Sequence, residues 1–375
     1  MSEFLPLRKS LMPSADDLLP YFREIDQNRW YSNFGALSRR FEERLAEHFG
    51  VDPENVIALC NGTAGLTLSL QSIMKSESGL CLVPSFTFAA SPAAIVNAGL
   101  SPYFSDINRD SWILTPDIAE EALEKAPSSV TAVMPVSPFG APLESKGWED
   151  FTERTGIPIV LDAAWAFDNV QASRIPAIIS LHVTKVMGIG EGGLVVSLDR
   201  DLVAEVRQRA NFGFGRDRHA HFASGNSKLS EYAAAVGLAA MDNWPKLRDS
   251  SLALAAIYAD YLSNTRGLRT MPGLNDGHAR AACAVEFDAP VAVQVSEYLE
   301  KEGIESRCWW GEPCHRHPAF TGFPCLSMDN TEDLCARMLN LPFFPEMSEK
   351  DVRRVCDSVE KATNMFGQGG GIDCS

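Results

Sequence analysis

Six short apolar runs recur along the amino-terminal half of the chain, and each is apolar at consecutive rather than alternate positions. They are residues 56–60, 80–84, 133–136, 157–161, 177–181 and 193–197. A strand that is apolar on both faces needs cover on both faces, as in parallel sheets flanked by helices. Because helical patterns separate the runs, the sequence predicts an α/β domain with a mostly parallel sheet.

Two helical patterns frame this domain. In residues 35–49, Leu37, Phe41 and Leu45 form one apolar stripe at helical spacing. The stripe predicts packing against the core rather than chemistry. After the last apolar run, residues 230–264 form a long helical region that we expect to link two domains.

The pattern changes beyond the long helix, where short apolar runs and helical segments follow each other at 282–287, 291–302, 339–344 and 349–366. This mixture predicts a smaller α+β domain. We therefore expect an N-terminal segment and large domain over residues 1–245, a small C-terminal domain over 246–366, and a disordered glycine-rich tail over 367–375.

Composition narrows the classes of function. With 375 residues, of which 45% are hydrophobic and 22% charged, the chain has the composition of a globular protein. The formal net charge of −16 argues against a general binder of nucleic acid or anionic membranes, although a local pocket can still take an anion. The nine cysteines lack the spacing of a metal site, and no run reaches about 18 apolar residues. We expect a cytoplasmic protein without metal, membrane or nucleic-acid partners.

Lys185 is the strongest candidate for chemistry, because it stands just after an apolar run and before a glycine-rich turn. Apolar surroundings disfavour the charged form of a lysine, and the uncharged amine is a nucleophile. Such an amine forms a Schiff base with a carbonyl, as in enzymes that use pyridoxal phosphate (PLP). A solvated loop lysine is the alternative.

Other candidates follow the apolar runs, where ligands collect in parallel sheets. Asp162 suits a pyridine nitrogen or, equally, a helix N-cap. The backbone of the small-residue turn at Gly62, Thr63 and Ala64 suits a phosphate, which the Ser180 hydroxyl can bind from the other side. The ring of Phe88 suits a cofactor ring or the core.

In their order along the chain, these segments resemble the DegT/DnrJ/StrS family of PLP-dependent nucleotide-sugar aminotransferases. The resemblance runs from about Trp30 to the last helix and rests on residues 31–35, 61–66, 84–90, 161–166, 180–193, 211–213, 225–230, 313–318 and 339–342. It implies the fold type I (aspartate-aminotransferase-like) architecture, with a mostly parallel seven-stranded sheet and a small C-terminal α+β domain.

The resemblance also implies roles for single residues. Lys185 corresponds to the lysine that binds PLP covalently, and Asp162 to the partner of the pyridine nitrogen. Asn226 corresponds to an asparagine that reaches the PLP phosphate of the other subunit, which implies a homodimer with shared active sites. Substrate contacts are expected from Tyr31, Asn33, His315 and Lys228; structural or solvated roles are the alternative for all four.

Two residues depart from the family pattern. Trp165 stands where the family has a glutamine near the 3′-oxygen of PLP, and Ser137 stands where a histidine is common. We infer an unusual substrate pocket, with a protein of reduced activity as the alternative. Lys185 itself favours transamination, because the dehydrating branch of the family has histidine at that position.

The expected function is therefore transfer of an amino group, from glutamate, to a keto group of a nucleotide-linked sugar in cell-surface polysaccharide or natural-product biosynthesis. A PLP-binding regulatory or scaffold protein of the same fold is the alternative. A nicotinamide-binding Rossmann enzyme fits poorly, because the turn after the first strand lacks the GxGxxG spacing.

Overall fold

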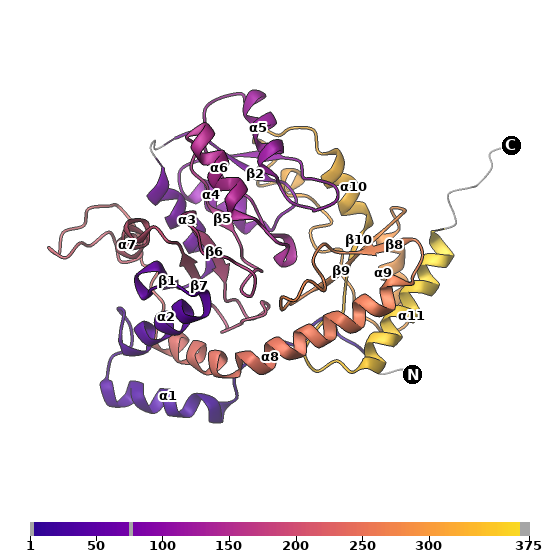
Figure 1. Ribbon diagram of the computed structural model, residues 1–375, viewed down its shortest axis with the longest axis horizontal. Coiled ribbons are helices and arrows are strands. Elements are labelled where there is room, and N and C mark those ends of the chain that lie inside the picture. The colour runs from indigo at the N-terminus through magenta and orange to yellow at the C-terminus, as the bar shows by residue number, and fades with distance from the viewer. Residues whose placement is uncertain (1–3, 75–77, 368–375) are drawn as a thin grey trace.

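A seven-stranded sheet forms the centre of the larger lobe in the computed structural model, which describes residues 4–74 and 78–367 (Figure 1). Strands β3, β2 and β4 pair in parallel, β5 pairs in parallel with β6, and β7 runs antiparallel to both β6 and β1. Two parallel bridges, Val133 to Ile159 and Val136 to Asp162, join the two groups. The strands are β1 (Val56–Leu59), β2 (Leu80–Pro84), β3 (Ser101–Ser105), β4 (Val130–Val133), β5 (Leu161–Asp162), β6 (Ala177–Ser180) and β7 (Gly193–Val196).

The predicted sheet is confirmed as mostly parallel, with local corrections. Strand β3 was not predicted. The predicted strands at 133–136 and 157–161 are shifted: β4 ends at Val133, and β5 begins only at Leu161. The segments between them are joined by single bridges and backbone hydrogen bonds rather than by a regular ladder.

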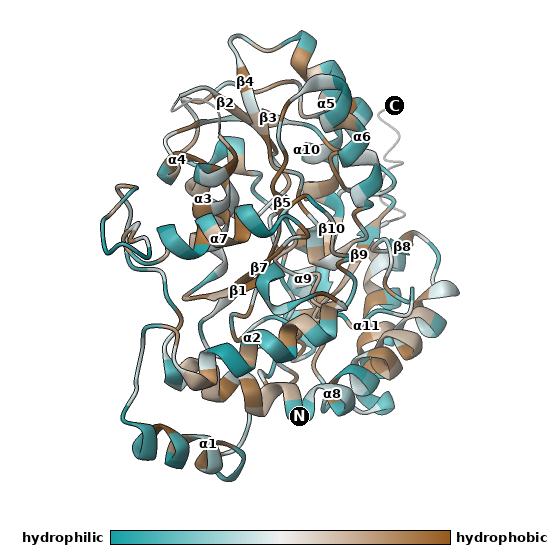
Figure 2. Ribbon diagram, turned by 60° about the vertical axis from the view of Figure 1, so that its left-hand side comes forward, coloured by the Kyte–Doolittle hydropathy of each residue, from teal (hydrophilic) through white to brown (hydrophobic). Residues whose placement is uncertain are grey.

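Helices cover both faces of this sheet. Alternate residues of β1 show the division, since Val56 and Ala58 belong to one core while Ile57 and Leu59 belong to the other. Figure 2 shows β1 and β7 as hydrophobic ribbon between helices with hydrophilic outer surfaces. The first core includes α2 (Ala36–Phe49), α5 (Pro116–Glu124), α6 (Ser145–Thr155) and the start of α8, and the second includes α3 (Gly62–Ile73), α4 (Ala90–Asn97) and α7 (Arg200–Arg209).

Helix α8 (Glu231–Ser263) runs beneath both lobes, from α1 (Ala15–Asn28) and α2 to the C-terminal helix (Figure 1). Ser230 caps its first turn through a hydrogen bond from Ala233 N–H. The Glu231 carboxylate accepts the N–H groups of Leu37 and Ser38, at 2.8 and 3.0 Å, and so stabilises the start of α2. The predicted long helix is therefore present, and its start packs with α2 in the first core.

The second lobe has its own apolar core around an antiparallel sheet in the order β10-β9-β8. Leu5 belongs to this core and pairs with Ile304. The predicted helices at 291–302 and 349–366 are found, whereas the run at 339–344 is a strand only in its first part. The elements are β8 (Leu268–Thr270), β9 (Cys283–Phe287), α9 (Ala292–Lys301), α10 (Asp329–Arg337), β10 (Met338–Leu341) and α11 (Glu349–Phe366).

The predicted domain division at residue 245 stays a prediction. Residue 245 is Pro245, inside α8. The N-terminal segment, predicted as part of the large domain, packs on the second lobe through Leu5. The predicted disordered tail lies outside the described residues, apart from Gly367 at the end of α11.

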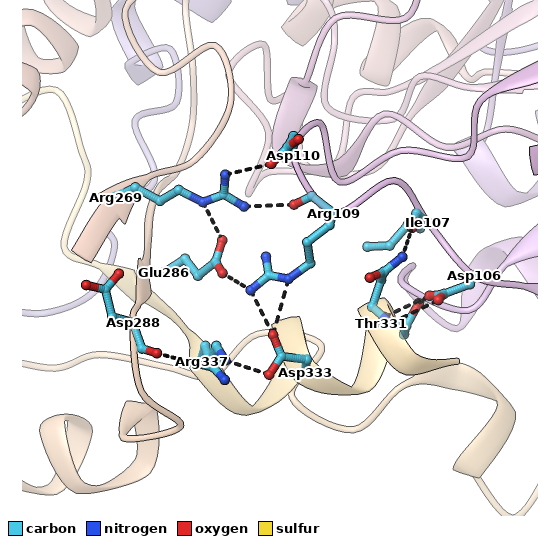
Figure 3. Close-up of polar contacts among 11 residues, drawn as sticks. Asp106, Ile107, Arg109, Asp110, Arg269, Glu286, Asp288, Thr331, Asp333 and Arg337 are labelled. Atoms are coloured by element: carbon cyan, nitrogen blue, oxygen red, sulfur yellow. Dashed lines mark hydrogen bonds and ion pairs between the residues drawn. The ribbon is translucent and has the colours of Figure 1, made fainter. Parts of the chain in front are cut away.

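An ionic network joins the loop after β3 to the second lobe (Figure 3). Arg109 bonds to Glu286 and, at 2.9 Å, to Asp333. Arg269 bonds to the other Glu286 oxygen at 2.7 Å, and Arg337 to Asp333 at 2.6 Å. Each of these three guanidinium groups therefore meets a carboxylate of the protein itself.

Candidate active site

A cavity of about 300 Å³ lies where the strands of the large sheet end. It brings together seven of the predicted site residues, from four separate segments of the large lobe: Gly62, Thr63, Phe88, Asp162, Trp165, Ser180 and Lys185. Trp309 and Trp310 of the second lobe also line it. The site therefore lies between the two lobes, at the sheet edge where the sequence placed it.

Lys185 stands in this cavity with its Nζ 3.5 Å from the centre of the Trp165 ring. Burial lowers the pKa of the Lys185 amine to about 7, Asp162 opposes this shift, and Arg8 adds to it. A substantial fraction of the amine is therefore uncharged at neutral pH, as a nucleophile requires. The alternative of a fully solvated loop lysine is wrong.

Asp162 is buried at the end of β5, facing the same cavity. Its carboxylate accepts the Ser91 hydroxyl at 2.6 Å and the Ala164 N–H at 3.1 Å. Burial raises the pKa of Asp162, while these hydrogen bonds and the charge of Lys185 act in the opposite direction. No helix begins at this point of the described chain, so the N-cap alternative is wrong.

The start of α3 lies against Ser180, as a phosphate site built from both requires. A Cβ added to Gly62 would lie 3.3 Å from the Ser180 Cβ, so side chains larger than hydrogen crowd this position. Gly193 is needed for the same approach, since its added Cβ would lie 2.4 Å from the Asn61–Gly62 peptide. Ala64 does not line the cavity, and its N–H donates to the Asn61 side chain at 2.8 Å.

Phe88 is 58% exposed although it is apolar, and it lines the cavity. The core alternative therefore applies to Phe86, which is buried, and is wrong for Phe88. An apolar ring left open to a cavity favours a ligand ring that covers it, because burying such a ring is worth about 1.5–3 kcal/mol.

Taken together, these groups fit PLP. A partly uncharged amine, a buried carboxyl group, a helix start with a hydroxyl and an open aromatic ring surround one cavity, and each matches a different part of that cofactor. The cavity volume also lies at the lower end of the usual range for ligand sites, about 300–1,000 Å³.

Besides Ala64 and His315, four predicted substrate or cofactor residues do not line this cavity. Asn226 is exposed and pairs with Asn211, whose side chain accepts the Lys228 amine at 2.8 Å. Tyr31 is exposed and stacks on Tyr232, with ring centres 6.2 Å apart. Asn33 is exposed as well, in the left-handed backbone region at φ 63°. Their roles stay predictions.

His315 does not line the cavity and lies in a short 3-10 helix, Cys314–Arg316. Its Nδ1 lies 2.7 Å from the Ser85 hydroxyl, and its Nε2 lies 3.3 Å from Glu332. These contacts support the structural alternative for His315, and its predicted substrate role stays untested.

Ser137 is buried beside the strand that carries Asp162. Its N–H donates to the Asp162 carbonyl at 2.9 Å, and its hydroxyl donates to the Ala141 carbonyl. It does not line the cavity. Ser137, where the family commonly has histidine, therefore contacts the backbone of Asp162 without reaching the cavity. Trp165, in contrast, forms part of the cavity wall.

Several residues at the site were not predicted. Thr87 and Ser91 form a hydroxyl chain to Asp162, with 2.7 Å between their oxygens. His182 lines the cavity and bonds to Thr184. Arg8 lies near the same wall, with its guanidinium carbon 5.4 Å from the Trp165 ring centre. Thr87, His182 and Thr184 lie within segments that carry the family resemblance, and Ser91 directly follows one of them. Arg8 lies outside all of these segments.

Among the described residues, no group of three or more histidine, cysteine or acidic side chains is placed to hold a metal ion. None of the helices in those ranges combines the length and the apolar character needed to cross a membrane.

Comparison with known proteins places the chain in a family. The family model for DegT/DnrJ/EryC1/StrS aminotransferases matches residues 14–360. Protein Rv3402c of Mycobacterium tuberculosis is 30% identical over 374 residues, which cover 96% of this chain and 90% of the relative. A dTDP-4-dehydro-2,3,6-trideoxy-D-glucose 4-aminotransferase of Saccharopolyspora spinosa is 27% identical, covering 90% of this chain and 92% of its own.

A solved structure agrees with the fold. The crystal structure of DesI in the presence of its TDP-sugar product superposes with a TM-score of 0.87 at 31% identity, and the match covers 97% of this chain and 94% of DesI. At this coverage the match extends over both lobes. With a family match along nearly its whole length, the chain belongs to the DegT/DnrJ/EryC1/StrS aminotransferase family and is a PLP-dependent aminotransferase of fold type I.

Proposed function

We propose that the protein moves an amino group from glutamate to a keto group of a nucleotide-linked sugar. The observation that carries this proposal is the placement of the Lys185 amine and the buried Asp162 carboxyl in one cavity. The relatives support the sugar nucleotide as acceptor, because the Saccharopolyspora spinosa enzyme is named for a dTDP-sugar and DesI was solved with a TDP-sugar product.

PLP supplies an electron-withdrawing ring that stores the amino group between the two halves of the reaction. We assign the ring nitrogen to Asp162, whose buried carboxylate would hold a proton on that nitrogen. We assign the phosphate to Gly62, Thr63 and Ser180, and one ring face to Phe88. These groups hold and orient the cofactor.

Lys185 has two tasks in this proposal. Its uncharged amine would hold the resting cofactor. Once displaced by the donor, the amine would move the Cα proton of the donor to the cofactor in the first half, and would move a proton from the cofactor to the acceptor carbon in the second half. Both tasks need an amine that gains and loses a proton near neutral pH. The lowered pKa of Lys185 meets that need.

The proposal includes a homodimer in which Asn226 completes the site of the other subunit. Asn226 is exposed and does not line the cavity of its own chain. It pairs with Asn211, at the start of the segment that carries Phe212 and Phe214. These two apolar rings are 45% and 46% exposed, which favours cover by a second chain. Mixing Lys185→Ala with Asn226→Ala subunits should restore activity, and verified heterodimers without activity would contradict the shared site.

A PLP-binding protein with little turnover is the second candidate, favoured by the Trp165 ring that lies over the Lys185 amine. Absorbance spectroscopy separates the two. Glutamate should convert the wild-type cofactor to its amine form, and a keto-sugar nucleotide should convert it back. A spectrum unchanged by every amino acid tried would contradict the aminotransferase proposal. We also propose a cytoplasmic location for this activity.

A further inference from the structure

A second, smaller chamber of about 40 Å³ lies beside the main cavity, and Lys185 lines both. Four cationic residues line this chamber: Arg8, Lys9, Lys185 and Arg280. None of its lining residues in the described chain is acidic. Because the protein as a whole carries a net charge of −16, this positive lining is not a consequence of composition.

The four cations differ in how they are neutralised. Arg280 is buried and bonds to the Asp276 carboxylate. Lys9 is exposed and lies over the Phe344 ring. Arg8 has no carboxylate within bonding distance in the described chain: one nitrogen donates to the Ala281 carbonyl, and its buried Nε has no hydrogen-bond partner. Burial leaves Lys185 partly uncharged, because it lowers the pKa of that amine to about 7. Of the three that stay fully charged, Arg8 is therefore the one whose charge is both desolvated and unpaired.

Backbone hydrogen bonds hold Arg8 in this place. Leu5 N–H donates to the Gly303 carbonyl at 2.9 Å, and Phe343 N–H donates to the Leu7 carbonyl at 3.0 Å. The guanidinium carbon then lies beside two indoles that contact each other, 5.4 Å from the Trp165 ring centre and 5.3 Å from that of Trp309. Burial lowers the pKa of Arg8 to about 10, yet the group stays charged at neutral pH. Keeping an unpaired charge there costs stability, which favours a functional role.

The chemistry of the donor supplies the missing anion. An amino acid must bring its amine nitrogen to the position that the Lys185 amine serves. Its α-carboxylate carbon is then fixed about 2.5 Å from that nitrogen by covalent geometry. The carboxylate must therefore lie close to Lys185, where Arg8 is the desolvated cation without a carboxylate partner.

We propose that Arg8 binds the α-carboxylate of the amino donor and thereby selects amino acids over simple amines. This inference rests on the proposed aminotransferase function and names the residue that recognises one of its two substrates. A guanidinium suits the task, because its planar donors bind a carboxylate in a bidentate manner.

The size of the chamber favours a carboxylate over the diphosphate of a nucleotide. A space of this volume holds roughly three waters, at about 10–15 Å³ each. That is enough for a carboxylate group but not for a diphosphate with its flanking sugars. Loss of Arg8 should accordingly affect the donor and spare the acceptor.

The test compares Arg8→Gln and Arg8→Lys with Arg23→Gln, which alters an exposed arginine of α1. The two half-reactions are followed separately by stopped-flow absorbance on PLP-loaded enzyme. Arg8→Gln should raise the half-saturating glutamate concentration roughly 10- to 100-fold, with a smaller rise for Arg8→Lys. The half-saturating concentration of the keto-sugar nucleotide should stay at the wild-type value, and Arg23→Gln should change neither.

A binding measurement keeps this test separate from turnover. Glutarate has the two carboxylates of glutamate but no amine, so calorimetry reports carboxylate binding without a reaction. Wild type and Arg23→Gln should bind it, and Arg8→Gln should bind it at least roughly tenfold more weakly. Thermal unfolding checks that each variant is folded. If Arg8→Gln does not fold, the comparison uses Arg8→Lys in its place.

Three results would overturn the role of Arg8: an unchanged glutamate constant, a raised constant for the nucleotide instead, or glutarate binding equal to that of wild type. If wild type accepts no amino group from any amino acid, the proposed function fails. The glutarate titration then still decides whether Arg8 is a carboxylate site.

Discussion

Two clusters of cationic side chains in this protein are built in opposite ways. In the network that joins the lobes, Arg109, Arg269 and Arg337 share the carboxylates of Glu286 and Asp333 (Figure 3). Beside the cavity, Arg8 and Lys185 instead face the same indole. Charges that serve the fold are neutralised within the chain, whereas charges that serve binding leave room for an anion from outside.

Lys185→Ala should have the largest effect, and it tests the cationic side chains beside the cavity. Turnover should fall at least about 10⁴-fold, because both the amine that holds the cofactor and the proton carrier are lost. Steady-state assays with a keto-sugar nucleotide measure the effect. Lys246→Ala, at an exposed position of α8, is the matched control and should keep wild-type turnover. A Lys185→Ala enzyme of near-normal rate would refute the assigned role.

Asp162→Asn should have the next largest effect, roughly a 10²- to 10³-fold loss of turnover, since an amide is a poor partner for a protonated ring nitrogen. It should also lower the pKa of Lys185 further, because the Asp162 charge raises it in the wild type. The pH dependence of amine labelling in cofactor-free protein measures this shift. A Lys185 pKa that rises in this variant would contradict the described electrostatics.

Glu286→Gln tests the ionic network that joins the lobes. Here we expect lower stability rather than lower catalytic activity. The buried carboxylate faces two guanidinium groups, so its loss should reduce the free energy of unfolding by about 2–4 kcal/mol. Urea unfolding measures the change. Turnover per folded molecule should stay close to wild type. A large loss of turnover without loss of stability would show that this network serves catalysis and not the fold alone.

The same pair of sites should affect stability in two different pH ranges. Arg109 and Arg269 overcome the effect of burial and lower the pKa of Glu286 below 4.5, so its stabilisation is present above that pH and is lost as the pH falls through the folded value. The pKa of Lys185 is lowered from 10.5 to about 7, so the unfolded chain binds more protons between these values. Its contribution to stability should therefore rise from pH 7 to 10.5.

Lys185→Met isolates the second effect. It removes the titrating amine, so the difference in unfolding free energy between Lys185→Met and wild type should shrink as the pH rises from 7 toward 10. Urea unfolding of cofactor-free protein at several pH values gives this difference. A constant difference would show that the Lys185 amine is not perturbed by burial.

The sequence predicted the parts of this site that come from single segments. Lys185 and Gly62 follow strands of the large sheet and Asp162 ends one, so the rule for ligand sites in parallel sheets brought them together. Strand β3 was missed because Pro102 weakens its pattern. Such a proline is tolerated because β3 is an edge strand of the sheet.

Arg8 could not be predicted in the same way. No periodicity links it to Lys185, since its place depends on backbone pairing with the second lobe. Phe88 and Phe86 were also indistinguishable in the sequence, and only the turn after β2 sends one ring to the core and the other to the cavity. Asn226 belongs to a third class, because its predicted partner is on another chain.

The pairing of residues 5–7 with the second lobe has a practical consequence for handling the protein. Trimming the chain to the span matched by the family model, which begins at residue 14, would leave every strand of the large sheet in place. It would nevertheless remove Arg8. A shortened protein of this kind should keep the large sheet but lose the core contact of Leu5 and discriminate poorly among amines, so a weak activity measured on it would say little about the enzyme.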